Sequence, residues 1–436
     1  MPPAPSRRQS ILHAASSAVL LRAVSLACTL VQVRMVMPYL GTDRFGFVTV
    51  LLAIGSFFGL SDLGISSAFQ NDVTLAEARG EKTMLRPMFR TAQATLLVLA
   101  MAVAVILIAV AATLGKATFF RNLTPELAEQ AVPLTALFVL TSALNAPAAL
   151  SGRLAFGLHM GHLANLTVMW AQLLTLAAMA VTVLFHAPFS VFLLVTTVPP
   201  LCCNLALGIR LRRHIDAPAG RKWAGLPYAK HTVRSGLQFF ALGASQPLFF
   251  ALGPLLLSSA FGPAVVTAYG LAARALGVIH NLEAGILGAT WPALTESLGR
   301  GDYGRARRFL RRNVLITCGA FCAPVLLFPF LGPPLLALWS GLPAGDFPSW
   351  IVWPVTLLMF CVMAQGPFYI ALSAAGSVIV LAVSHFAASA AALGAVALWR
   401  SSPQMIPVCL AVAFAIFALV PAIIQTLRIY RPPAAT

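Results

Sequence analysis

The stretch SDLGISSAFQNDVTLAEARGE, Ser61–Glu81, has a counterpart 221 residues further along the chain, LEAGILGATWPALTESLGRGD at Leu282–Asp302. In this register an acid-x-Gly-Ile motif at 62–65 aligns with 283–286, and an Arg-Gly-acid motif at 79–81 aligns with 300–302. The register also pairs Arg86 and Arg90 with Arg307 and Arg311, and YLG at 39–41 with AFG at 260–262. Self-similarity at one fixed offset indicates an internal duplication.

The composition indicates whether the two copies fold in water or in a lipid bilayer. Of the 436 residues, 59% are hydrophobic and 9% charged, and the mean hydropathy is +0.87. Apolar stretches of about 20 residues recur, each long enough as a helix to cross a bilayer. The sequence therefore predicts an all-α integral membrane protein with twelve spans, near 14–36, 47–69, 92–114, 131–156, 163–185, 190–210, 236–259, 265–294, 314–333, 351–373, 378–399 and 406–427.

The duplication divides these spans into two six-helix lobes. Residues 1–210 form the N-terminal lobe, 236–436 the C-terminal lobe, and the polar, Pro- and Gly-bearing segment 211–235 is the linker between them. Because six is even, both lobes start on the same side of the membrane. The copies are then parallel and related by a pseudo-twofold axis along the membrane normal, with a cavity expected between them.

The distribution of Lys and Arg gives the expected orientation. Most of the 29 basic residues fall in alternate loops, which are cytoplasmic if the N-terminus is cytoplasmic, and both termini are then inside. The net charge of +17 does not indicate a nucleic-acid-binding protein, because no loop is long enough for a soluble basic domain. We instead expect the charge to set topology and to attract anionic phospholipids of the inner leaflet.

Three motifs near the N-terminus carry a family resemblance: YLGTDRFG at 39–46, SDLGISSAFQND at 61–72 and EARGE at 77–81. With the twelve spans, they resemble the polysaccharide transport (Wzx-like) flippases of the multidrug/oligosaccharidyl-lipid/polysaccharide (MOP) exporter superfamily. The resemblance implies a transporter, not an enzyme, that flips undecaprenyl-diphosphate-linked oligosaccharides across the bacterial inner membrane by alternating access.

The cargo implied by the resemblance serves O-antigen, capsule or exopolysaccharide synthesis, with a polysaccharide polymerase and glycosyltransferases as partners. Two alternatives stay open. One is a multidrug or cation exporter of the same superfamily, and the other is a membrane-embedded lipid-sugar enzyme.

Three arginines are the candidate substrate-binding residues. Arg22 lies near mid-depth of the first span, and Arg274 lies early in the eighth, so together they could hold a diphosphate from both lobes. Arg34 is nearer the outer end of the first span, where a side chain that snorkels to the interface is an equal alternative.

Asp62 and Glu283 are repeat-related acids about seven residues from the inner ends of their helices. Each is open to three interpretations: a structural ion pair, a coupling site for Na⁺ or H⁺, or an interfacial acid. Gln246 and Pro247 predict a kink or hinge in the seventh span, with a tolerated packing kink as the alternative. No cofactor or metal site is expected, since the seven cysteines lie in or beside apolar helices without accompanying ligands.

Overall fold

The structure is a computed structural model that describes residues 7–58, 62–115, 118, 120, 122–215, 223–288, 290–399 and 403–430. All regular elements in these residues are helices. Ten helical stretches are long and apolar enough to span a membrane. One of them, Ser16–Gly55, has two arms separated at Gly41, and the apolar helix Ser245–Phe261 adds a further span. The prediction of a multi-pass, all-α membrane protein with about twelve spans is confirmed.

The chain forms two compact units. The first comprises Met1–Gly41, Ile54–Phe120 and Thr124–Gly243, and the second comprises Thr42–Ala53, Arg121–Leu123 and Ala244–Thr436. The boundary at 243/244 lies inside helix α8 (Leu226–Phe261), whereas the sequence analysis starts the C-terminal lobe at 236. Helix α8 begins at Leu226, within the predicted linker 211–235.

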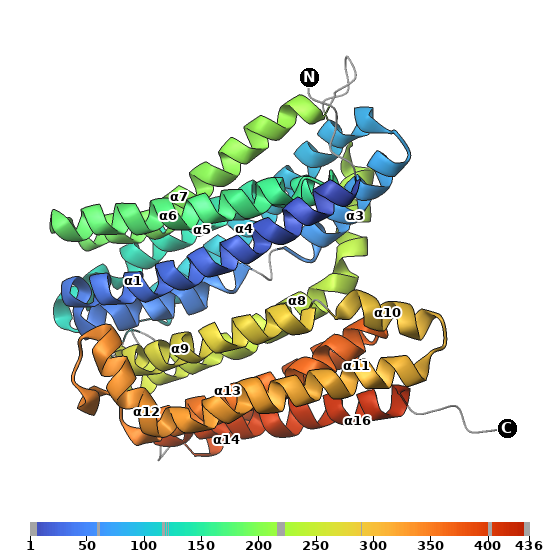
Figure 1. Ribbon diagram of the computed structural model, residues 1–436. Helices are drawn as coiled ribbons and strands as arrows, with labels where there is room; N and C mark the ends of the chain where they lie inside the picture. Colours follow the sequence, from blue (N-terminus) through green and yellow to red (C-terminus); the bar gives the residue numbers. More distant parts are fainter. Residues whose placement is uncertain are drawn as a thin grey trace. The chain divides into compact units, whose positions relative to one another are not determined.

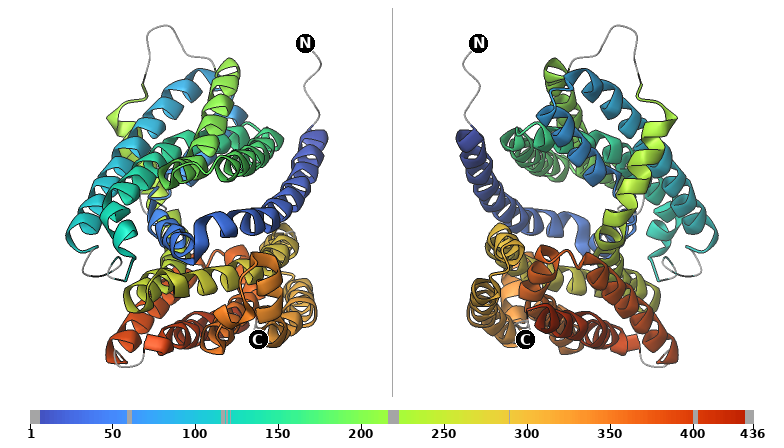
Figure 2. Two further views of the ribbon diagram at one scale, coloured as in Figure 1. Left: turned by 90° about the vertical axis from the view of Figure 1, so that its left-hand side faces the viewer. Right: turned by 90° about the vertical axis from the view of Figure 1, so that its right-hand side faces the viewer.

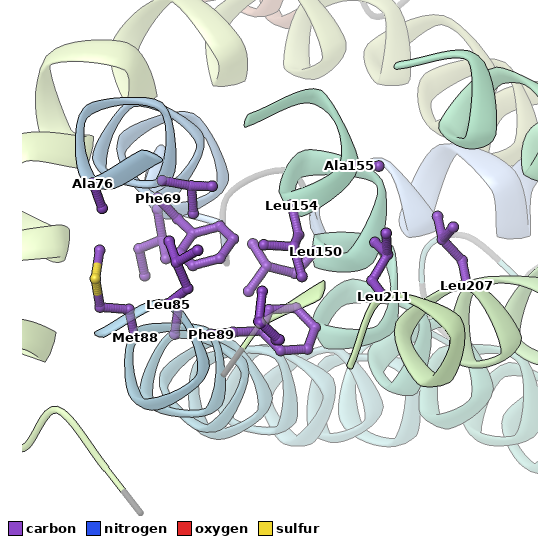
Figure 3. Packing of buried hydrophobic residues seen from close by; sticks show 14 of the residues in the cluster. Phe69, Ala76, Leu85, Met88, Phe89, Leu150, Leu154, Ala155, Leu207 and Leu211 are labelled. Carbon is purple, nitrogen blue, oxygen red and sulfur yellow. The ribbon is translucent and has the colours of Figure 1, made fainter. Parts of the chain in front are cut away.

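The first unit is built around α5 (Pro125–Gly157), which contacts α3 (Ile65–Ala78), α4 (Lys82–Thr113), α6 (Gly161–Leu184) and α7 (Phe189–Leu211). Figure 1 shows α5, α6 and α7 running side by side. At one end of the unit, an apolar cluster joins α3, α4, α5 and the end of α7 (Figure 3). Its fully buried members include Phe69, Leu85 and Leu154, which fix these helices against one another.

The second unit surrounds α13 (Ser349–Ala374), which contacts α9 (Pro263–Gly288), α12 (Ala323–Ser340), α15 (Ile406–Phe414) and α16 (Val420–Ile429). Figure 2 shows these helices, coloured from yellow to red, nearly end-on as a bundle. The remaining helices are α10 (Trp291–Gly299), α11 (Tyr303–Ile316) and α14 (Val378–Leu398). Two short π-helices, Thr317–Cys322 and Ala415–Leu419, interrupt the bundle.

The internal duplication is visible in one turn of each unit. Helix α3 ends at Ala78 and α4 begins at Lys82, while α10 ends at Gly299 and α11 begins at Tyr303, which is the same spacing 221 residues later. Gly80 and Gly301 both have positive φ, 73° and 70°. The amides of Glu81 and Asp302 donate to the carbonyls of Ala76 and Ser297 at 2.9 Å each. The two turns are built alike, as the register predicts.

The predicted span 265–294 falls within one candidate span, Pro263–Gly299. The predicted span 47–69 is wrong as a continuous helix, because one helix ends at Gly55 and the next begins at Ile65. Leu63 and Gly64 both have positive φ, 43° and 70°, which a helix cannot accommodate. Gly64 also lies so close to the backbone of Gly236 that any Cβ would overlap the Gly236 carbonyl oxygen.

Candidate functional site

A series of polar contacts joins α1 (Arg7–Gly55) and α6 along their length. Asn165 donates to Ser17 Oγ at 2.9 Å, Ser25 donates to Gln172 Oε1 at 2.7 Å, and Gln32 donates to Met179 Sδ at 3.2 Å. The hydroxyl of Tyr39 donates to the carbonyl of Ala187. Each contact joins residues 147 or 148 positions apart, so the two helices run in the same direction with one constant register.

A pocket of about 320 Å³ opens between α1, α6 and α7 at the middle of this series. Its polar lining consists of Ser25, Thr29, Gln32, Gln172, Thr175, Thr196 and Asn204. Gln172 lies halfway along α6, which places the pocket near the middle of the membrane span. None of the lining residues is charged, so we define this neutral pocket as the candidate binding site of the first unit.

Part of the hydrogen-bonding capacity in the pocket is unused. Thr175 Oγ1 is buried without a hydrogen-bond partner. Within the described residues, the amide nitrogens of Gln172 and Asn204 also make no hydrogen bond, although Gln172 Oε1 accepts from Ser25. Unpaired polar groups at membrane depth cost free energy unless they bind water or a ligand. The pocket can therefore donate to and accept from a neutral polar group.

The predicted arginines lie outside this pocket. Arg22 is exposed on α1, three residues before Ser25, and Arg34 is exposed two residues after Gln32. In the second unit, the guanidinium of Arg274 is half-buried and lies 5.0 Å from the ring centroid of Phe45. A cation above an aromatic ring is stabilised without any phosphate ligand. Arg22 and Arg274 belong to different units, so their proposed joint grip stays a prediction.

Glu283 forms a second candidate site within the second unit. Its side chain is fully buried, and Thr317 donates a hydrogen bond to Oε1 at 2.8 Å. His280 Nδ1 lies 3.4 Å from Oε2. Gly366 on α13 lies against the carboxylate, where a side chain would collide with Oε1. Thr317 opens a π-helix, a distortion that is frequent at functional sites.

Asp62 has a different environment from its repeat partner. It is half-buried and precedes α3, where its Oδ1 accepts a hydrogen bond from the amide of Ser66 at 3.0 Å. Its backbone carbonyl accepts from Ile65 at 2.7 Å. The carboxylate thus satisfies one amide at the start of α3, a common role of Asp. Within the described residues Asp62 forms no ion pair.

Gln246 and Pro247 lie inside α8, close to the boundary of the two units. Pro247 cannot donate the helical hydrogen bond to the carbonyl of Gly243, the last residue of the first unit. On the first-unit side, α8 is fixed to α3 because Tyr228 donates to Asp72 at 3.0 Å. Burial, assisted by the Asp72 charge, raises the pKa of Tyr228 well above its ordinary value of 10. The phenol therefore stays a donor at neutral pH.

Other polar residues at membrane depth have structural partners. Asn145 donates to the carbonyl of Thr197 at 2.8 Å. Gln365 donates to the carbonyl of Ala418 at 2.9 Å, and its Oε1 lies 3.1 Å from His385 Nε2. These amides therefore form hydrogen bonds between helices.

The sequence analysis missed most of the neutral pocket. The signal that could have found it is the spacing of Ser25, Thr29 and Gln32 on the first span, which places three polar residues on one helical face. Asn165 and Gln172 repeat the pattern on the fifth span. A search for charges alone passes over such a face.

Comparisons with known proteins identify the fold. No family model and no curated protein sequence matches the chain. Among solved structures, it is similar to the inward-facing conformation of a multidrug resistance MATE family transporter of the MOP superfamily. The TM-score is 0.74 at 13% identity, covering 94% of this chain and 98% of that one.

Two further solved structures have the same fold. The chain resembles a MOP superfamily transporter from Pyrococcus furiosus with a TM-score of 0.65 at 13% identity, covering 98% of this chain and 96% of that one. It resembles a eukaryotic MATE transporter with a TM-score of 0.67 at 12% identity, covering 98% of both chains. The protein therefore has the fold of MOP superfamily transporters.

Proposed function

We propose that the protein is a multidrug-type exporter of small amphipathic molecules that carry neutral hydrogen-bonding groups. The neutral pocket carries this proposal, because it offers unpaired amide and hydroxyl groups at membrane depth and no charge. Its volume of about 320 Å³ suits a small molecule or the polar part of a larger one. The likeness to multidrug transporters supports the same class, although fold alone does not select a substrate.

This proposal replaces the flippase interpretation as the better supported one. Flipping of a lipid-linked oligosaccharide requires cationic groups to hold a diphosphate, and Arg22 and Arg34 do not line the pocket. The half-buried Arg274 has Phe45 as an aromatic partner. The multidrug exporter named as an alternative from the sequence needs none of these contacts.

We further propose Glu283 as the coupling residue and the proton as its ion. A buried carboxylate that gains and loses a proton changes its hydrogen bonds to Thr317 and His280, which can bias the helices that carry them. Hard cations require several oxygen ligands. The neighbours of Glu283, one hydroxyl and one imidazole, favour a proton over Na⁺. Transport of the exported solute would then be exchange against protons.

Purified protein in liposomes tests the proposal. With an imposed pH gradient, we expect transport of neutral and cationic fluorescent amphiphiles and no transbilayer movement of a fluorescent prenyl-diphosphate sugar. Gln172→Leu removes one neutral hydrogen-bonding group from the pocket, so we expect transport of hydrogen-bonding dyes at low concentration to fall about fivefold.

The matched control is Gln70→Leu, which removes an amide of the same size on α3, outside the pocket. Equal transport by the Gln172 variant and the unaltered protein would exclude the neutral pocket as the binding site. Movement of the prenyl lipid without dye transport would restore the flippase interpretation.

A further inference from the structure

A second hollow lies on the first unit between α6 and α7, separate from the neutral pocket. Its volume is about 250 Å³, and we call it the α6–α7 groove. Its lining residues are Leu163, Leu166, Thr167, Trp170, Cys203, Ala206, Leu207 and Arg210. They recur at positions three, four and seven apart on both helices, so the groove follows the helices rather than crossing them.

The wall of the groove is apolar except at one end. Thr167 donates its hydroxyl to the carbonyl of Leu163 at 2.8 Å, so this hydroxyl is already paired within α6. Trp170 is 56% exposed, which leaves much of its indole available to a neighbouring molecule. A groove with these surfaces accepts a hydrocarbon chain and offers nothing to a polar solute.

Arg210 gives the groove a polar end. It is exposed, stands in the last turn of α7, and lies at the same end of the unit as Leu163, which is near the start of α6. Arg212 and Arg213 follow after the buried Leu211 and are exposed too. Within the described residues, Arg210 takes part in no ion pair with a carboxylate.

The chemistry of a bilayer selects the occupant. Any acyl chain is as apolar as its lipid neighbours, so the groove alone does not choose among lipids. Arg210 supplies the choice, because a cation at the polar end of the groove attracts an anionic headgroup. A zwitterionic headgroup carries an ammonium group that an arginine repels, whereas an anionic headgroup has a phosphate without this group. A guanidinium can hold such a phosphate with two parallel hydrogen bonds.

We propose that the α6–α7 groove binds an anionic phospholipid, with one acyl chain along the groove past Trp170 and the phosphate on Arg210. This site is independent of the neutral pocket and of the substrate proposed for it. The net positive charge of the chain attracts anionic phospholipids in general, and this proposal gives them a defined binding site.

Tryptophan fluorescence in detergent tests the proposal. The full chain, with its seven tryptophans, is titrated with brominated phosphatidylglycerol or brominated phosphatidylcholine, whose bromine atoms quench a nearby indole. We expect a quenched component that half-saturates at about fivefold lower phosphatidylglycerol than phosphatidylcholine. Trp170→Phe should remove this component, and Arg210→Gln should abolish the preference for phosphatidylglycerol.

Arg213→Gln is the matched control, since it removes the same charge from the same end without touching the groove. It should keep the preference. Size-exclusion profiles and melting temperatures in detergent verify that each variant is folded. Equal half-saturation by both lipids in the unaltered protein, or an unchanged preference in a folded Arg210 variant, would overturn the proposal.

Discussion

Gly64 shows how one residue supports the broken second span. It combines a φ of 70° with a backbone contact to Gly236, so two separate constraints require glycine there. Gly80 has a similar φ of 73°, but open space surrounds the position of its missing side chain. A comparison of Gly64 with Gly80 therefore separates the cost of a positive φ from the cost of steric overlap.

We predict that Gly64→Ala destabilises the protein by at least about 2 kcal/mol more than Gly80→Ala does. Both variants carry the cost of a side chain at positive φ, about 1 to 2 kcal/mol, and only the first also pushes α8 away. Apparent melting temperatures in one detergent measure the difference. Equal losses in the two variants would show that the Gly236 contact has no energetic weight.

Glu283 and Asp62 should respond differently to the same change. Glu283→Gln keeps the shape of the buried side chain but cannot release a proton, so we predict loss of transport driven by a pH gradient while solute exchange at equal pH persists. Asp62→Asn keeps an acceptor for the Ser66 amide and should transport normally. The exposed Glu296, paired with Arg300 at 2.7 Å, provides a control substitution to Gln.

At the scale of the residue, the sequence indicates which side chains are unusual but not what surrounds them. Asp62 and Glu283 are matched by the repeat, yet one faces the amide of Ser66 and the other faces Thr317, a residue 34 positions away. Such a contact depends on packing between distant helices. Neutral residues such as Gln172 carry a still weaker signal, since an amide in an apolar helix has many uses.

Helix α8 is shared by the two units. Its first part belongs to the first unit and its remainder to the second, and the hydrogen bond that Pro247 cannot make is the one that Gly243 would accept at that boundary. A helix that lacks one hydrogen bond bends more easily there than elsewhere. The hinge expected at Gln246 and Pro247 therefore has a specific location.

We predict that Pro247→Ala lowers the maximal rate of transport several-fold while the affinity for the solute changes little. Alanine restores the hydrogen bond and stiffens α8 without altering the neutral pocket. Initial rates over a range of solute concentrations separate the two quantities. Pro254→Ala in the same helix, seven residues further on, is the matched control, and an equal effect there would contradict a hinge at 247.

At the scale of the element, the sequence predicts helices well because apolar length and Gly–acid turns are local signals. The turn at Gly80 and its copy at Gly301 fall where the repeat requires. The interruption after Gly55 is not local, since it depends on Gly236 in another helix. Continuous hydropathy across 47–69 therefore predicts a continuous helix where the structure has two.

For the whole molecule, the even number of spans and the basic loops predict that both termini lie on the cytoplasmic side of the membrane. A fluorescent protein fused at the C-terminus should then fluoresce, and alkaline phosphatase fused there should be inactive. Alkaline phosphatase fused after Leu123, between the third and fourth spans, should be active. The opposite pattern would invert the topology, and with it the leaflet from which Arg210 recruits its lipid.

The equal turns at Gly80 and Gly301 have a consequence for the history of the protein. After the duplication, both repeats kept the same turn at their surface, while the residues of their interiors diverged. The first unit now carries the neutral pocket, and the second carries the buried Glu283. The ancestral symmetry thus persists in the turns, whereas the polar chemistry of the two interiors has become different.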